Sequence, residues 1–279
     1  MGTFTIEPVA GAVGAEVRGI DLATPLDDET AAELRAAFND NGVLIFRDQA
    51  LSIGEQLRFG RHFGPLGHHP YVEAHPDHPE VLEVITEPDD RVNFGGGWHS
   101  DVTFLPEPDL GSILYAVDVP AYGGDTLFAD QRAAYDALSD TMKGLLDGLV
   151  AVHSAGLQYS GRGYSKQSSA MVTHGEDEAA ASEVEHPVIR THPETGRKSL
   201  FVNRAFTARI KGMHRAESAA LLEFLFGHGV KERFTCRLRW QPGSVAMWDN
   251  RSVQHYALHD YKGSRRHMRR ITIQGDRPR

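Results

Sequence analysis

Residues 95–104 read GGGWHSDVTF, which places His99 and Asp101 two residues apart behind three glycines. Successive side chains of a strand point to opposite faces, so a short strand here would direct both groups to the same side. An imidazole and a carboxylate that converge suit a metal site, a proton-transfer pair or a buried hydrogen bond. The chain has fifteen histidines, so the pair alone leaves all three interpretations open.

The composition of the chain is that of an ordinary globular protein. It has 279 residues, of which 41% are hydrophobic and 24% charged, both typical of soluble domains. The net charge of −9 argues against nucleic acid or an anionic membrane as the main partner. The start, MGTFTIEPVAG, lacks the features of a secretion signal, and no apolar run is long enough to span a membrane. We therefore expect a cytoplasmic protein, and the single cysteine, Cys236, excludes an internal disulfide.

Short strands dominate the pattern of hydrophobic residues. Helical spacing predicts helices at 27–42, 52–64, 130–149 and 214–229. Strands are expected at 14–22, 42–48, 81–86, 112–119, 125–130, 187–192, 199–203, 234–240, 244–250 and 269–274. Strands and helices do not alternate regularly, which disfavours a doubly wound sheet. We predict one domain over residues 1–279, mainly β with flanking helices, and a mobile insertion or lid around residues 160–185.

A second motif supplies a third ligand. Residues 244–261, SVAMWDNRSVQHYALHDY, place His255 after another alternating strand. Two histidines and one carboxylate on one face of a metal leave three coordination positions open, as in non-haem iron(II) oxygenases. A structural zinc site would instead close its shell with four protein ligands, commonly cysteines.

Arginines cluster near the C-terminal end, where residues 264–275 read SRRHMRRITIQG. Strand alternation places Arg266 and Arg270 on one face, together with Met268 and Thr272. A solvated basic face is one interpretation. Burial of two unpaired guanidiniums would be costly, so the other is that both face the metal site and bind two anions.

Five sequence blocks in this order resemble the taurine/2-oxoglutarate dioxygenase family: WHSDVTF, GGDTLFAD, HPVIRTHPETGRKSLFVN, WDNRSVQHYA and RRHMRRITIQGDRP. The resemblance extends from about residue 5 to residue 278. It implies a double-stranded β-helix (jelly-roll) core and a homo-oligomer, either a dimer or a tetramer. It also implies Fe(II), with 2-oxoglutarate and O2 as co-substrates. 2-Oxoglutarate would be decarboxylated to succinate and CO2 while a C–H bond of a small organic substrate is hydroxylated.

The resemblance also assigns residues. It implies His99, Asp101 and His255 as iron ligands and catalytic residues. Arg266 and Thr126 would bind the distal carboxylate of 2-oxoglutarate. The substrate positions that it implies are Arg270, which would hold an anionic group, and His69, Val102, Phe104, Tyr159, Phe206 and Gly95.

Two pocket positions depart from the taurine enzyme's pattern. Gly95 replaces an asparagine and Tyr159 replaces a phenylalanine; Asn93 is a candidate to compensate for the first change. Taurine or another sulfonate, with release of sulfite and an aldehyde, is the first expectation for the substrate. Alternatives are an alkyl sulfate ester, an aryloxy or other carboxylate, and a phosphonate. A non-catalytic jelly-roll module that binds a metal or anion and a zinc hydrolase are the rival functions.

Overall fold

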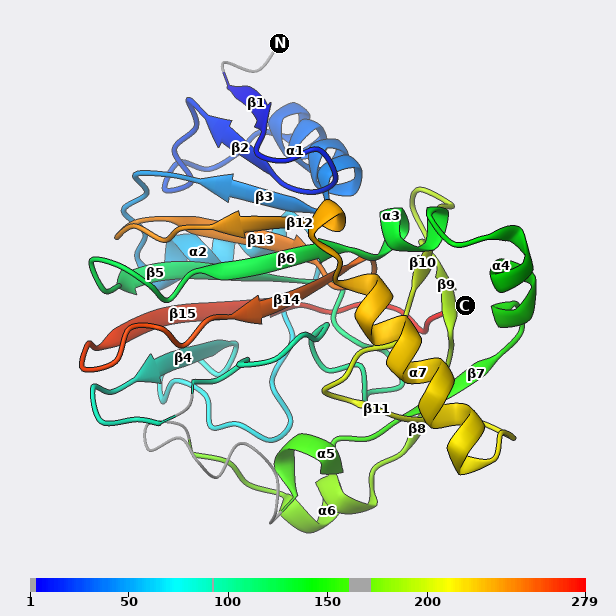
Figure 1. Cartoon of the computed structure of the whole chain (residues 1–279). Helices are drawn as coiled ribbons and strands as arrows, with labels where there is room; N and C mark the ends of the chain where they lie inside the picture. Colours follow the sequence, from blue (N-terminus) through cyan, green and yellow to red (C-terminus); the bar gives the residue numbers. More distant parts are fainter. Residues whose placement is uncertain (1–3, 92, 161–171) are drawn as a thin grey trace.

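The computed structural model describes residues 4–91, 93–160 and 172–279. The predicted class, mainly β with flanking helices, is confirmed (Figure 1). The largest sheet contains, in spatial order, β1 (Thr5–Pro8), β2 (Ala15–Arg18), β3 (Val43–Phe46), β13 (Val245–Asp249), β5 (Gly111–Asp118), β15 (Arg266–Ile273) and β4 (Val81–Thr86). Neighbours in this sheet are antiparallel except for β2 and β3. Strands distant in sequence are therefore adjacent in space.

The described residues also form three smaller sheets and several helices. The sheets are β12 (Thr235–Leu238), β6 (Thr126–Asp130) and β14 (Val253–Ala257); β11 (Thr207–Ile210), β7 (Val150–His153) and β8 (Val184–Pro187); and β10 (Lys198–Leu200) with β9 (Ile189–Thr191). The helices are α1 (Asp28–Asn41), α2 (Ile53–Arg61), α3 (Gln131–Asp136), α4 (Asp140–Leu146), α5 (Gly156–Tyr159), α6 (Glu176–Ala181), α7 (Arg215–Gly229) and the 3-10 helix η2 (Glu232–Phe234). Among the residues described, no helix has the length and apolar character needed to cross a bilayer.

The middle of the largest sheet is buried on both faces. On β13, Val245 and Met247 pack in a hydrophobic cluster with residues of α1 and α2. Ala246 and Trp248 point the other way, into a second cluster that includes Phe128 of β6. Burial on both faces explains why β13 reads as a continuous apolar run. The second cluster lies between the large sheet and the β12–β6–β14 sheet, and the candidate site is built at this level.

The helix boundaries follow local capping chemistry. Helix α2 is capped by Ser52, the first residue of the predicted range: its hydroxyl accepts from the main-chain N–H of Glu55, and the Glu55 carboxylate accepts from the main-chain N–H of Ser52. The predicted helix over 130–149 is wrong, because the structure has two short helices, α3 and α4, in its place. Ser139 separates them: its hydroxyl accepts from the N–H of Met142 and starts a new helix.

The strand expected around His99 and Asp101 is also wrong. His99 forms only an isolated antiparallel bridge with His255, and the chain turns at residues 101–104. The turn is made by Val102, which has a positive φ of 45° and whose carbonyl accepts from the N–H of Leu105 (2.9 Å). The N–H of Asp101 donates to the Oδ1 of Asn250 (3.2 Å) instead of to a neighbouring strand.

The predicted insertion at 160–185 is only partly visible. Residues 161–171 lie outside the described residues. The remainder includes an isolated bridge between Thr173 and Val72, helix α6 and the start of β8. The prediction of a lid therefore stays a prediction.

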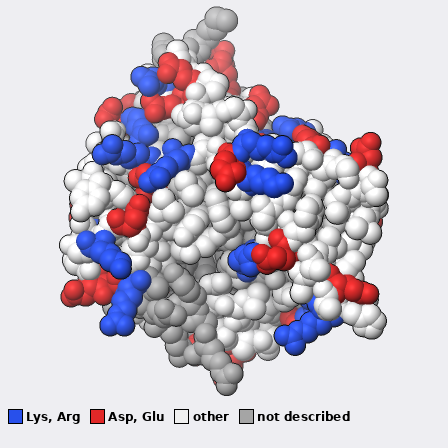
Figure 2. Space-filling view, viewed as in Figure 1, with Lys and Arg blue, Asp and Glu red and all other residues white. Residues whose placement is uncertain are grey.

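On the face of the molecule seen in Figure 2, basic and acidic side chains lie interspersed.

Candidate active site

Main-chain hydrogen bonds bring the three predicted ligands together. His255 lies on β14, and its N–H and carbonyl pair with those of His99 at 2.7 and 3.1 Å. Asp101 follows at the turn, so that its Oδ1 lies 3.6 Å from Nε2 of His99 and 3.9 Å from Nε2 of His255. The candidate ligand atoms of the three residues lie within 4.8 Å of one another, and all three side chains are buried.

The protonation of both imidazoles suits metal binding. Nδ1 of His99 lies 2.7 Å from the carbonyl oxygen of Gly97, which can only accept, so Nδ1 carries the proton and Nε2 presents its lone pair. Burial, reinforced by the neighbouring His99, lowers the pKa of His255 to about 3 and keeps it neutral. The ring of Trp248 lies against His255, with the ring centres 4.6 Å apart.

The carboxylate of Asp101 is held from two sides. The hydroxyl of Ser112 donates to Oδ2 at 2.6 Å, and Nη1 of Arg270 donates to Oδ1 at 3.1 Å. Burial alone would raise the pKa of Asp101, but Arg270 and the two histidines outweigh it and hold the pKa well below its usual range. The sequence analysis did not identify Ser112 or Asn250, whose side-chain amide lies 3.3 Å from the Ser112 hydroxyl.

The donor set fits a divalent first-row metal. Two neutral nitrogen ligands and one carboxylate oxygen are the ligands of metal centres with open coordination positions. Among the described residues, no fourth histidine, cysteine or carboxylate belongs to the group, as closure of a structural zinc site would require.

A small cavity of about 30 Å³ lies beside this triad, and a buried guanidinium that forms no ion pair with the described residues lines it. Its lining includes Thr126, His255, Arg266 and Arg270. Within the described part of the chain, Nε and Nη2 of Arg266 have no hydrogen-bond partner, although the side chain is buried. Thr126 accepts from Nε1 of Trp240 (2.9 Å), which leaves its own proton free to be donated. These groups can bind an anion.

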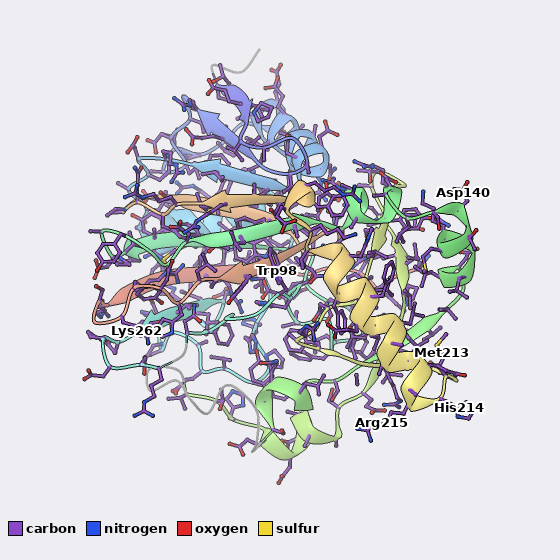
Figure 3. All side chains as sticks on the ribbon, in the orientation of Figure 1. Trp98, Asp140, Met213, His214, Arg215 and Lys262 are labelled. Carbon is purple, nitrogen blue, oxygen red and sulfur yellow. The ribbon has the colours of Figure 1, made fainter. Side chains whose placement is uncertain are left out.

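A larger cavity of about 210 Å³ also borders the triad and shares Phe94, Gly95 and His99 with the small one. Its lining is mostly aromatic and glycine-rich: His69, Phe94, Gly95, Gly96, Gly97, Trp98, His99, Asp101, Val102, Gln158, Tyr159, Arg204, Ala205 and Phe206. Trp98 lies towards the middle of the molecule, and its ring contacts Tyr256 of β14 (Figure 3). Among these described lining residues, Asp101 is the only carboxylate.

Most of the predicted substrate residues line the larger cavity, and one of them packs behind its wall. His69, Val102, Tyr159, Phe206 and Gly95 all line the larger cavity. By contrast, Phe104 packs behind it, with its ring centre 5.0 Å from that of Phe206 and 5.7 Å from that of Tyr159.

The structure also shows which of His69, Asn93 and Arg270 line the larger cavity. His68 is exposed and bonded to the carbonyl of Pro79, so His69 is the histidine of the cavity. Asn93 does not line the cavity: its amide donates to the carbonyl of Ala257 (2.9 Å) and ties the glycine-rich loop to β14. Arg270 lines the small cavity, not the large one.

Two polar groups of the large cavity, His69 and Tyr159, are uncharged. Burial, together with the charge of Arg270, lowers the pKa of His69 to about 3. Burial raises the pKa of Tyr159, so its hydroxyl stays protonated. Arg204 is half-exposed and pairs with Glu223 at 2.7 Å.

Comparison with known proteins places this geometry in a family. The model of the family described as "Taurine catabolism dioxygenase TauD, TfdA family" matches residues 5–272. The chain is 38% identical over 275 residues to an alpha-ketoglutarate-dependent sulfate ester dioxygenase of Pseudomonas putida, covering 98% of this chain and 90% of that protein. It is 36% identical over 273 residues to an alkylsulfatase of Acinetobacter baylyi, covering 97% and 85% of the two chains. A solved taurine dioxygenase from Burkholderia xenovorans has a TM-score of 0.84 and 34% identity, covering 99% and 93%.

Proposed function

The chain belongs to the taurine catabolism dioxygenase TauD, TfdA family, and from this premise we propose that it hydroxylates a sulfate ester or sulfonate with an apolar body. It is a 2-oxoglutarate-dependent dioxygenase, and its relatives act on small anionic substrates. One observation carries the choice of substrate: aromatic rings wall the cavity beside the triad, and among its described lining residues the only carboxylate is the ligand Asp101.

The metal that we propose is Fe(II), held by His99, Asp101 and His255. The hydrogen bond that turns Nδ1 of His99 to the Gly97 carbonyl, the lowered pKa values of His255 and Asp101, and the close spacing of the three side chains support this set. When bound, iron supplies the dioxygen chemistry that couples decarboxylation of 2-oxoglutarate to oxidation of a C–H bond. Ser112 and Arg270 hold the Asp101 carboxylate in place from outside the triad. A double-stranded β-helix is the fold that we infer, because the large sheet and the β12–β6–β14 sheet share one core.

Arg266 is the residue that we assign to the distal carboxylate of 2-oxoglutarate. A buried guanidinium with two unpartnered nitrogens gains most from a carboxylate, which can accept two parallel hydrogen bonds. Thr126, which lines the same cavity, can donate a further bond from its hydroxyl. Anchoring at this end fixes the register of the co-substrate against the triad.

The atoms of the proposed reaction balance as follows. One oxygen atom of O2 enters succinate, as 2-oxoglutarate loses CO2, and the other enters the substrate C–H bond. If that carbon bears a sulfate ester, the bond from the hydroxylated carbon to the sulfate oxygen breaks, which gives an aldehyde and sulfate. If the carbon bears a sulfonate, the C–S bond breaks and sulfite leaves. Arg270 lines the adjoining small cavity beside Asp101, and we assign its positive charge to the sulfo group, which would lie where the two cavities meet near His99.

Taurine, the first expectation from the sequence, fits this cavity less well than a substrate with an apolar tail. Its ammonium group would enter an aromatic cavity in which the described lining residues offer no carboxylate other than Asp101. Burial of a charge without a counterion is costly. An alkyl chain against Phe94, Trp98 and Phe206 would instead gain about 0.8 kcal/mol for each buried CH₂ group.

The test is a substrate panel. The protein would be incubated in air with Fe(II), ascorbate and 2-oxoglutarate, and with hexyl sulfate, hexane-1-sulfonate, phenoxyacetate or taurine. Succinate, sulfate and sulfite would be quantified. We expect kcat/KM for one of the hexyl compounds to exceed that for taurine by at least about tenfold. Faster turnover of taurine, or turnover of phenoxyacetate alone, would overturn the proposed substrate class.

A further inference from the structure

We propose that Asn250 is a positioning residue of the metal site: it directs the hydroxyl of Ser112 onto one oxygen of Asp101, so that the other oxygen faces the two histidines. This inference rests on the proposed function, because it takes Asp101 as a metal ligand. Asn250 is buried in the turn that follows β13, and Ser112 is buried on β5. These two described residues line neither cavity, so both would act through Asp101.

The orientation of the Asn250 amide follows from the groups that donate to it. Its Oδ1 accepts from the main-chain N–H of Asp101 (3.2 Å) and from Nε1 of Trp248 (3.0 Å). Both partners can only donate, so the amide oxygen must lie on their side and the NH₂ group on the other. The NH₂ group then donates to the hydroxyl oxygen of Ser112 at 3.3 Å.

This bond sets the direction of the Ser112 hydroxyl. An oxygen that accepts from Asn250 keeps its own proton for another acceptor, and Ser112 donates it to Oδ2 of Asp101 at 2.6 Å. A hydrogen bond to an ionised carboxylate is about twice as strong as one between neutral groups. The three residues form a closed circuit, in which Asn250 holds the main chain of Asp101 directly and its side chain through Ser112.

The two carboxylate oxygens of Asp101 have different surroundings. Oδ1 lies 3.6 Å from Nε2 of His99 and 3.9 Å from Nε2 of His255. It also accepts from Nη1 of Arg270, which leaves a second lone-pair site on the same oxygen for a metal. Oδ2 is tied to strand β5 by Ser112. The circuit therefore decides which oxygen faces the histidines and keeps the carboxylate from rotating away from them.

Asn250 is itself held by a turn built on buried charged groups. The carboxylate of the preceding residue, Asp249, accepts from Nε of Arg251 at 2.8 Å and lies 2.9 Å from Nε2 of His192. Nδ1 of His192 accepts from two main-chain N–H groups, so Nε2 carries the proton and donates to Asp249. His192 opens the HPETG segment, to which the metal and co-substrate assignments give no role. These contacts orient Asn250 before a metal binds.

The first experiment measures metal affinity without turnover. Mn(II) would be titrated calorimetrically into the metal-free protein in the absence of 2-oxoglutarate and substrate. We expect Ser112→Ala and Asn250→Ala each to raise Kd for Mn(II) by about 10- to 100-fold, because loss of a partner that orients a metal ligand weakens binding by this much. Unchanged Kd in both variants, with folding checked by thermal unfolding, would overturn the proposal.

Two matched controls separate positioning from loss of stability. Ser218→Ala, on helix α7, removes another buried serine hydroxyl, which accepts from the N–H of Ile210. Gln56→Ala, on helix α2, removes another buried amide, which donates to two main-chain carbonyls. Both controls should lower the unfolding temperature but change Kd for Mn(II) by no more than about twofold. A control that weakened Mn(II) binding as much as its counterpart would show an effect of stability alone and would overturn the positioning role.

The second experiment is a double-mutant cycle that tests whether Asn250 acts through Ser112. In the Ser112→Ala protein the bond to Oδ2 of Asp101 is already lost. Adding Asn250→Ala should therefore raise Kd for Mn(II) by no more than about threefold, from loss of the bond to the Asp101 N–H. If the double variant shows the full product of the two single effects, the two residues act independently and the proposed circuit is wrong.

Failure of this inference can be told from failure of the proposed function. The dioxygenase assignment predicts that the wild-type protein binds one metal ion and forms succinate slowly without any substrate. If the wild-type protein neither binds Mn(II) nor forms succinate with Fe(II), the proposed function fails. If it does both, and Asn250→Ala and Ser112→Ala bind Mn(II) as tightly as the wild type, the role of Asn250 is wrong and the reaction class stands.

Discussion

The two sides of the site are supported by different kinds of structure. On one side, Thr126 and His255 lie on the paired strands β6 and β14, and Arg266 lies on β15 of the large sheet. On the other, Gly95 and Phe206 lie in turns, and Tyr159 is the last residue of a helix of four residues. The strand side faces the small cavity and the loop side forms most of the wall of the large one.

Because of this difference, the strand side can fix the reaction and the loop side can vary the substrate. Along β15 the alternation of side chains turns Arg266 and Arg270 inward whatever the adjoining loops do. The loop side is positioned by a few tertiary bonds, such as those from Asn93 to the carbonyl of Ala257 and from the N–H of Ala257 to the carbonyl of Gly95. A framework of strands can therefore keep one reaction while the loops select the substrate. Three variants test how cleanly the two sides separate.

The largest effect is expected on the strand side, from loss of a ligand. His255→Ala removes one of three proposed metal ligands, so we expect succinate formation to fall by more than about 1,000-fold, with weaker retention of iron. The measurements are succinate by chromatography and bound iron after desalting. His62→Ala, at the end of α2, is the control and should retain both. Undiminished turnover in His255→Ala would contradict the assignment of the triad.

The second effect concerns Arg266, which lines the small cavity. Arg266→Ala should raise KM for 2-oxoglutarate by about 100-fold, because a charge-assisted pair is lost. Its sequence neighbour provides the control: the side chain of Arg265 is 40% exposed and pairs with Glu87 at 3.3 Å. Arg265→Ala should change this KM by no more than about twofold. A rise in the substrate KM instead would mean that the roles of Arg266 and Arg270 are exchanged.

Much of the strand side could be predicted from the sequence. The two motifs around His99 and His255 contain the candidate ligands, and the period of a strand places Arg266 and Arg270 on one face. Even where the predicted strand was wrong, the bridge to His255 and the turn at Val102 bring Asp101 to the same place. The residues that supply the donor atoms could therefore be predicted without the backbone conformation that holds them.

The loop side could not be predicted in the same way. Nothing in the sequence indicates that Tyr159 bonds to His69, because this contact joins segments 90 residues apart. The bond from Ser112 of strand β5 to Asp101 is likewise a tertiary contact that no local pattern shows. A hydroxyl on a strand or helix has no preferred partner until the tertiary fold is formed. The residues were named as pocket positions from resemblance, but their bonds depend on packing that no local pattern records.

The smallest effect addresses Gly95, where the two sides meet. Gly95 has φ of +79°, and a Cβ there would lie 3.3 Å from Cε1 of His99, whereas a Cβ at Gly97 would meet nothing within 4 Å. We expect Gly95→Ala to lower the free energy of unfolding by about 1 kcal/mol and kcat/KM by a few fold, and Gly97→Ala to lose less on both measurements. Thermal unfolding and substrate kinetics check this. If Gly95→Ala changes only the substrate KM, the glycine provides space for the substrate. If it also weakens iron retention, the glycine seats the imidazole of His99, and the loop side then contributes to the chemistry as well as to substrate choice.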